Sequence, residues 1–135
     1  MENQEIDVDF LKEKNILYVE DDELAQKLLM RVLSRRFNKI FSASDGKEGL
    51  EIYQNKSSEI DLIITDIQMP NLDGLEMAKQ IKRQNSNIPI VITSAFNDSD
   101  YLRRSEEIKI DEYLNKPIEI QSLIRIIHDI LKKKK

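Results

Sequence analysis

The stretch of residues 60–74, IDLIITDIQMPNLDG, constrains the fold of this chain more than any other. Its apolar run ends at Asp66, and the start of a helix is indicated at Asp73. A short apolar run of this kind predicts a strand buried on both faces, as in a parallel sheet covered by helices. Ligands gather where the strands of such sheets end, so Asp66 is expected in a functional site. A partly desolvated carboxylate there must be paired with a cation or held neutral.

Composition and charge narrow the class of protein. The chain has 135 residues, enough for one domain with its own core, and no cysteine, which excludes disulfides and thiolate metal sites. Its acidic start is unlike a secretory signal, and no apolar run approaches a membrane span. We expect a cytoplasmic protein without membrane contact.

The charge distribution argues against nucleic-acid binding. The net charge is −4, but the last four residues are all lysine, and the rest of the chain carries a net charge of −8. A nucleic-acid binder normally presents a basic face. We interpret the lysine tail as cations that complement the C-terminal end of a helix.

The remaining pattern predicts strands that alternate with helices. We expect a leader at residues 1–13 with a short helix around Phe10, a folded domain at residues 14–132, and a basic tail at residues 133–135. Outside the central run, strands are expected at residues 15–19, 40–43, 88–93 and 112–114. Five helices should follow them, at residues 24–33, from Asp45 through Tyr53, from Asp73 through Ile81, around Tyr101 and Leu102, and at residues 120–131. Such alternation predicts a parallel sheet with helices on both faces.

The carboxyl ends of parallel strands lie at one edge of the sheet. In this chain that edge should collect Glu20, Asp21, Asp66, Ser94 and Lys116. Three carboxylates in one pocket repel each other, and one lysine leaves the cluster short of positive charge. An all-oxygen site without histidine or cysteine suits Mg²⁺ or Mn²⁺. A metal, a lysine, a hydroxyl and a carboxylate nucleophile together match the needs of phosphoryl transfer.

Four motifs carry a resemblance to a known family. LYVEDD, IITDIQMPNLDG, PIVITSA and EYLNKP occur in the order and at the intervals of the receiver domains of response regulators. The chain resembles such a domain of bacterial two-component signalling, of the stand-alone chemotaxis-regulator type, over residues 15–131. The resemblance implies a doubly wound, flavodoxin-like sheet of order 2-1-3-4-5 with five helices.

The resemblance also implies a role for each residue at the edge. Asp66 would be the phosphoacceptor, and Asp21 would bind Mg²⁺ directly. Glu20 would act on the metal through water, and Gln68 would offer its backbone carbonyl. A peptide bond from Lys116 to Pro117 is expected in the cis form.

A second set of residues would transmit the signal. Ser94 and Lys116 would contact the phosphoryl group, and Tyr113 would turn inward as Ser94 moves. The surface of the fourth helix, fifth strand and fifth helix would then change its affinity for a partner. Gln68 and Phe96 occupy positions that tune the lifetime of the phosphoryl group. Because Phe96 cannot hold a water molecule, we hypothesise a long lifetime, which loss of the phosphoryl group within seconds would contradict.

The resemblance implies a protein that acts through others. The phosphoryl donor would be a sensor histidine kinase or a phosphotransfer protein. A separate protein would be the downstream target, and phosphorylation-dependent homodimers would fit the family. Enzymatic activity would be limited to self-catalysed phosphoryl transfer and autodephosphorylation. The Lys109-Ile110 pair departs from the common Gly-Ala and marks a partner surface that differs.

Other interpretations remain open at this point. Asp22, Asp45 and Asp73 fit helix caps, Asp61 is expected to face solvent, and His128 to be a boundary or partner-facing residue. A haloacid-dehalogenase-type phosphatase would need a second aspartate where Gln68 stands. A pseudo-receiver would bind partners without phosphorylation, although the full set of site residues argues against it. A flavodoxin-like flavin protein is a third alternative, but no phosphate-binding loop follows the first strand.

Overall fold

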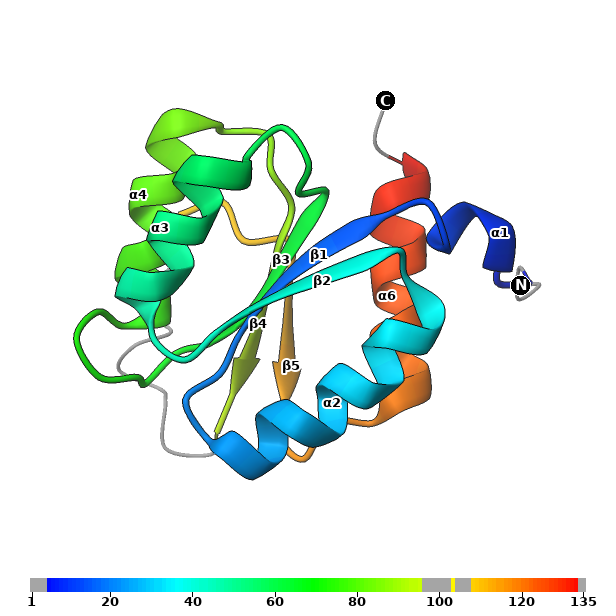
Figure 1. Cartoon of the computed structure of the whole chain (residues 1–135), viewed down its shortest axis with the longest axis horizontal. Helices are drawn as coiled ribbons and strands as arrows, with labels where there is room; N and C mark the ends of the chain where they lie inside the picture. Colours follow the sequence, from blue (N-terminus) through cyan, green and yellow to red (C-terminus); the bar gives the residue numbers. More distant parts are fainter. Residues whose placement is uncertain (1–4, 96–102, 104–107, 134–135) are drawn as a thin grey trace.

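The computed structural model of the chain describes residues 5–95, 103 and 108–133. Its strands form one parallel sheet in the order β2-β1-β3-β4-β5 (Figure 1). The strands are β1 (Asn15–Val19), β2 (Lys39–Ala43), β3 (Leu62–Asp66), β4 (Ile90–Ser94) and β5 (Glu112–Asn115). This order confirms the predicted fold class.

Helices cover both faces of the sheet (Figure 1). The described helices are α1 (Val8–Leu11), α2 (Glu23–Arg36), α3 (Gly46–Lys56), α4 (Gly74–Gln84) and α6 (Ile120–Lys133). One face carries α3 and α4, and the other carries α2 and α6. The helix expected around Tyr101 and Leu102 lies outside the described residues. None of the described helices combines the length and the apolar character that a membrane crossing requires.

The continuous apolar runs are explained by burial on two sides. Side chains of a strand point alternately to opposite faces, so both faces of a central strand need apolar residues. In β1, Leu17 and Val19 join the core under α3 and α4, whereas Ile16 and Tyr18 join the core under α2 and α6. All five residues of β3 are buried, and Asp66 is the last of them.

Short polar contacts fix where the helices begin. Asp22, Asp45 and Asp73 each accept a backbone N–H in the first turn of the following helix, which confirms all three as caps. Asp61 does not simply face solvent as expected. Its carboxylate Oδ2 accepts the backbone N–H of Asn15 at 2.8 Å and ties the start of β3 to the start of β1.

The apolar face of α2 is narrower than the sequence predicts. Leu29 and Leu33 are buried, but Leu24 and Leu28 are 67% and 54% exposed. The helical spacing of these four leucines predicts that they share one face of α2. The sheet covers only part of that face, and two leucines are left in contact with solvent.

The described part of the leader, from residue 5 on, packs against α6 through its short helix α1. Leu11 is buried, and Phe10 packs against the core under α2 and α6. The Phe10 ring meets the His128 ring edge to face, with 6.1 Å between centroids. Lys132 Nζ lies 4.3 Å from the centre of the Phe10 ring and donates to Asp7 Oδ2 at 2.9 Å. One lysine of the basic end of the chain therefore holds the leader in place.

His128 is part of this contact and is not the boundary or partner-facing residue that the sequence predicted. It is 2% exposed, and its Nε2 accepts the backbone N–H of Asp7 at 3.0 Å. An accepting Nε2 leaves the proton on Nδ1, which lies 3.0 Å from Asp129 Oδ1 and donates to it. The leader covers this side of α6, which explains the burial of a histidine near the end of a helix.

The docked leader predicts a stability effect. Truncating a fully buried phenylalanine costs about 3–5 kcal/mol, so we expect Phe10→Ala, at a partly buried site, to lower the free energy of unfolding by about 2 kcal/mol. Urea denaturation measures the change. Val8→Ala is the matched control, because Val8 lies on the same helix but is 55% exposed. Equal, small effects of the two substitutions would show that the leader is not docked in solution.

Candidate functional site

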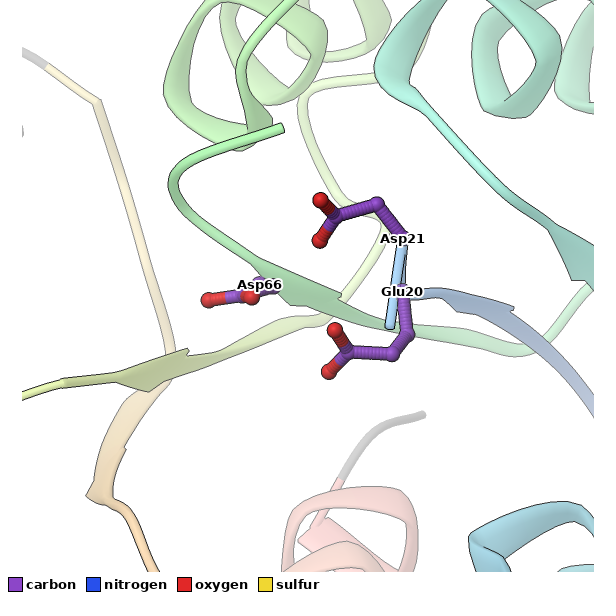
Figure 2. A group of neighbouring side chains, drawn as sticks. All are labelled: Glu20, Asp21 and Asp66. Atoms are coloured by element: carbon purple, nitrogen blue, oxygen red, sulfur yellow. The ribbon is translucent and has the colours of Figure 1, made fainter. Parts of the chain in front are cut away.

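The predicted edge residues come together at the carboxyl ends of the strands. Glu20 and Asp21 follow β1, and Asp66 ends β3. Figure 2 shows their three carboxylates pointing to the same side of the sheet edge. One carboxylate oxygen from each residue lies within 4.8 Å of the others. Glu20 and Asp66 are buried, whereas Asp21 is exposed, so the cluster opens to solvent on the Asp21 side.

Lys116 supplies positive charge from the loop after β5. Its Nζ donates to Asp66 Oδ2 at 2.8 Å and to Glu20 Oε1 at 3.4 Å. Burial lowers the pKa of Lys116, but the hydrogen bond and attraction of Asp66, with Glu20 adding to them, outweigh burial and raise the pKa. The amino group is therefore charged at neutral pH. The peptide bond between Lys116 and Pro117 is cis, as expected.

The Glu20 carboxylate is compensated only in part by its neighbours. Burial raises the pKa of Glu20, and the Asp66 carboxylate raises it further. The backbone N–H of Asp22, which donates to Glu20 Oε2 at 3.0 Å, and the Lys116 ammonium lower it only in part. A second cation at this place would stabilise the ionised carboxylates.

The donor set fits a hard divalent cation. The three clustered residues offer only carboxylate oxygens, which Mg²⁺ prefers. Asp21 and the loop of residues 68–73 also line one open pocket of about 490 Å³. Gln68, whose backbone carbonyl is predicted to bind the cation, thus lines the same pocket as Asp21. The residues that would hold the cation are Asp21, Asp66 and the Gln68 carbonyl, with Glu20 beside them.

The two predicted switch residues sit on β4 and β5. Ser94 is buried at the end of β4, and its hydroxyl donates to Asn115 Oδ1 at 3.4 Å. Tyr113 lies opposite Ile92 in the register of β4 and β5 and is partly buried against the core under α3 and α4. Phe96, predicted to tune the phosphoryl lifetime, lies outside the described residues.

Gly74 supports the site, and sequence reasoning missed it. A Cβ at this position would lie 1.9 Å from the backbone oxygen of Asp66, and the Gly74 N–H donates to Ile67 O at 2.7 Å. Only glycine lets the first turn of α4 lie directly on the end of β3. A glycine directly after a capping aspartate, where a better helix former would be expected, was the available signal.

Comparison with known proteins identifies the family. The profile of the response regulator receiver domain matches residues 16–128. This chain belongs to the response regulator receiver family. It is 30% identical over 118 residues to a chemotaxis protein CheY from Halobacterium salinarum, with 87% of this chain and 97% of that protein covered. Several other curated relatives are longer, and this receiver domain spans about half of their length.

Solved structures agree with this assignment. A receiver domain protein from Clostridium thermocellum superposes with a TM-score of 0.83 at 28% identity, covering 89% of this chain and 95% of that one. CheY from Borrelia burgdorferi, in a complex with CheX, BeF₃ and Mg²⁺, gives 0.78 at 25% identity, covering 87% and 88%.

Family membership settles the class of function. Receiver domains are phosphorylation-activated switches of two-component signalling, and this chain is one of them. They act as signalling switches rather than as enzymes on separate substrates. The phosphatase and pseudo-receiver alternatives are therefore not favoured.

The raised pKa of Glu20 predicts a pH-dependent stability. Free glutamate titrates near 4.5, so above that pH the folded protein binds more protons here than the unfolded chain. The free energy of unfolding then falls as pH rises toward the raised pKa, and the penalty is absent below about 4.5. Glu20→Gln mimics the protonated form. We expect this variant to be more stable than the wild type at pH 7 in EDTA, with the difference vanishing near pH 4.

Denaturant unfolding at both pH values checks this expectation. Glu119→Gln is the control, because Ser122 hydrogen bonds lower the pKa of exposed Glu119, and that variant should not gain stability at pH 7. A Glu20→Gln variant that is less stable than the wild type at pH 7 without metal would contradict the account.

Proposed function

We propose that this receiver domain accepts a phosphoryl group on Asp66 and is switched by it. The observation that carries the proposal is the contact of Lys116 Nζ with Asp66 Oδ2 at 2.8 Å, inside a cluster of three carboxylates. A lysine held this way is placed to bind a phosphoryl oxygen once one is attached to Asp66. The proposal includes the roles that the family resemblance implies for the other site residues, namely Glu20, Asp21, Gln68, Ser94, Tyr113 and Lys116.

The chain itself prepares Asp66 for attack on phosphorus. Its Oδ1 accepts the backbone N–H of Ile67 at 2.8 Å, and its Oδ2 accepts from Lys116. These two hydrogen bonds fix the plane of the carboxylate. An Asp66 oxygen forms the new bond to phosphorus, and the bond between phosphorus and the donor breaks, with its electron pair leaving on the donor. Bound Mg²⁺ would supply charge neutralisation of the phosphoryl oxygens.

The switch follows from the new anion. The Ser94 hydroxyl leaves Asn115 and donates to a phosphoryl oxygen, and Tyr113 turns into the space that Ser94 leaves. This changes the surface around β5 and α6, which is predicted to contact the downstream target or a second copy of the chain. Moving such an equilibrium from mostly off to mostly on needs about 5 kcal/mol of differential binding, so phosphorylation alone tilts it only in part.

The phosphoryl donor needs a docking surface near Asp66. The exposed leucine Leu28 borders a groove of about 590 Å³ that reaches the site residues Glu20 and Lys116. Its apolar wall is formed by the α2 side chains and by the loop into α6, namely Ala25, Leu28, Leu29, Val32, Pro117, Ile118 and Ile120. We propose that a histidine kinase or phosphotransfer protein docks here. A donor protein seated in this groove would present its phosphohistidine beside Glu20 and Lys116, and Lys116 contacts Asp66.

Several finer predictions stay part of this proposal. They are the domain boundaries at residues 14–132, the cytoplasmic location, the use of Mg²⁺ or Mn²⁺, autodephosphorylation, and a long phosphoryl lifetime set by Gln68 and Phe96. The Borrelia relative was solved with CheX and Mg²⁺, which supports a metal and a protein partner for this chain.

Phosphorylation by a small donor tests the phosphoacceptor. With acetyl phosphate and Mg²⁺, we expect wild type to gain the mass of one phosphoryl group and Asp66→Asn to gain none, because an amide is a poor nucleophile. Intact mass spectrometry measures the gain. Asp61→Asn, directly before the same strand, is the control and should be modified like wild type. Equal modification of Asp66→Asn would place the phosphoacceptor elsewhere.

If the donor protein docks in this groove, a substitution in the groove should slow transfer from a histidine kinase but not from acetyl phosphate. Leu28→Ser should slow phosphotransfer from a phosphorylated histidine kinase at least about fivefold, because burial of an apolar anchor is lost. Modification by acetyl phosphate should stay unchanged, since a small donor needs no groove. Val8→Ser changes an equally exposed apolar residue on α1 and should affect neither reaction. Unchanged transfer from the kinase to Leu28→Ser would exclude the groove.

A further inference from the structure

The loop that carries Glu20 and Asp21 is held by a side chain outside the carboxylate cluster. Gln26 lies in the first turn of α2, and its Nε2 donates to two backbone carbonyls, Glu20 O and Ala43 O, each at 2.9 Å. The Glu20 N–H also donates to Ala43 O at 3.0 Å. Because both partners are acceptors, only the NH₂ group of the amide can face them, which fixes the orientation of Gln26.

This clamp joins three elements at the site. It connects the end of β1, the end of β2 and the first turn of α2, and both hydrogens of the amide are used. The Glu20 carbonyl precedes the backbone of Asp21 directly. Asp22 then caps α2 by accepting from Leu24 and Ala25. The backbone is therefore held on both sides of Asp21, at the Glu20 carbonyl and at the Asp22 cap, although the Asp21 side chain is exposed.

We propose that Gln26 is a positioning residue for metal binding, which sets the place of the Asp21 carboxylate without touching the cation. The inference rests on the proposed function, since the cation is part of that function. A ligand held in its bound position before binding loses less conformational freedom on binding, so affinity rises without a new contact. Loss of the clamp should thus weaken Mg²⁺ binding even though all ligands remain.

A titration with MgCl₂ followed by NMR of backbone amides tests this role. Gln26→Met keeps the shape of the side chain and removes both donors, and we expect its Kd for Mg²⁺ to rise roughly tenfold, because the Asp21 carboxylate must then be ordered when the cation binds. The amides of Glu20 and Asp22 should exchange faster in the metal-free variant. Gln80→Met is the control: Gln80 is also partly buried, lies on α4, and contacts Glu76 at 3.4 Å.

The readouts separate a positioning role from a merely structural one. If Gln26 had only a structural role, Gln26→Met would lower the midpoint of urea unfolding but leave the Kd for Mg²⁺ and the exchange of these amides at wild-type values. That result would overturn the inference. Gln26→Asn provides a second variant. Its shorter side chain cannot reach both carbonyls, so we expect the same loss of affinity for Mg²⁺. If wild type itself shows no Mg²⁺-dependent shifts near Asp21 and Asp66, the proposed metal site fails, and the inference fails with it.

Discussion

The unbalanced charge at the sheet edge is the constraint on which the rest of this structure depends. Three carboxylates meet there, and Lys116 offsets one of them through its 2.8 Å contact with Asp66. Burial, and then repulsion by the Asp66 carboxylate, raise the pKa of Glu20. We therefore expect this cluster to lower the free energy of unfolding of the metal-free protein. The same imbalance favours a bound cation, which together with the Lys116 ammonium would offset the charge of a phosphoryl group attached to Asp66.

The scaffold must hold these groups against their repulsion. Apolar residues on both faces of β1 and β3 bury the strands and fix where they end. Gly74 lets α4 begin directly on the backbone of Asp66. Asn71, at a positive φ of 69°, donates to Asp45 Oδ2 and ties the loop after β3 to the start of α3. The loops that carry the site are thus anchored by residues outside the carboxylate cluster.

Local patterns explain how much could be predicted from the sequence. Strand ends, the three aspartate caps and the convergence of Glu20, Asp21, Asp66 and Lys116 follow from apolar runs and from the parallel direction of the strands. The cis peptide at Pro117 and the strand order came from the family resemblance. Together these features predict the candidate site at the edge of the sheet where the structure has it.

The features that escaped prediction depend on contacts between distant segments. His128 is buried because the leader folds over α6, and nothing near His128 in the sequence indicates this. Leu24 and Leu28 are exposed because the sheet does not reach them, although their spacing along the helix predicts the same face as Leu29. The contact of Gln26 on α2 with Ala43 on β2, and that of Asn115 on β5 with Ser94 on β4, also join segments far apart in the sequence. A single sequence shows the character of a side chain but not its distant neighbour.

The most direct test of the central claim is a crystal structure grown with MgCl₂ and beryllofluoride, a tetrahedral mimic of a phosphoryl group. We expect beryllofluoride on an Asp66 carboxylate oxygen, with Lys116 Nζ and the Ser94 hydroxyl contacting its fluorine atoms and the cation between Asp21 and Asp66. An unmodified Asp66 under these conditions, or a cation bound away from Asp21, would contradict the account.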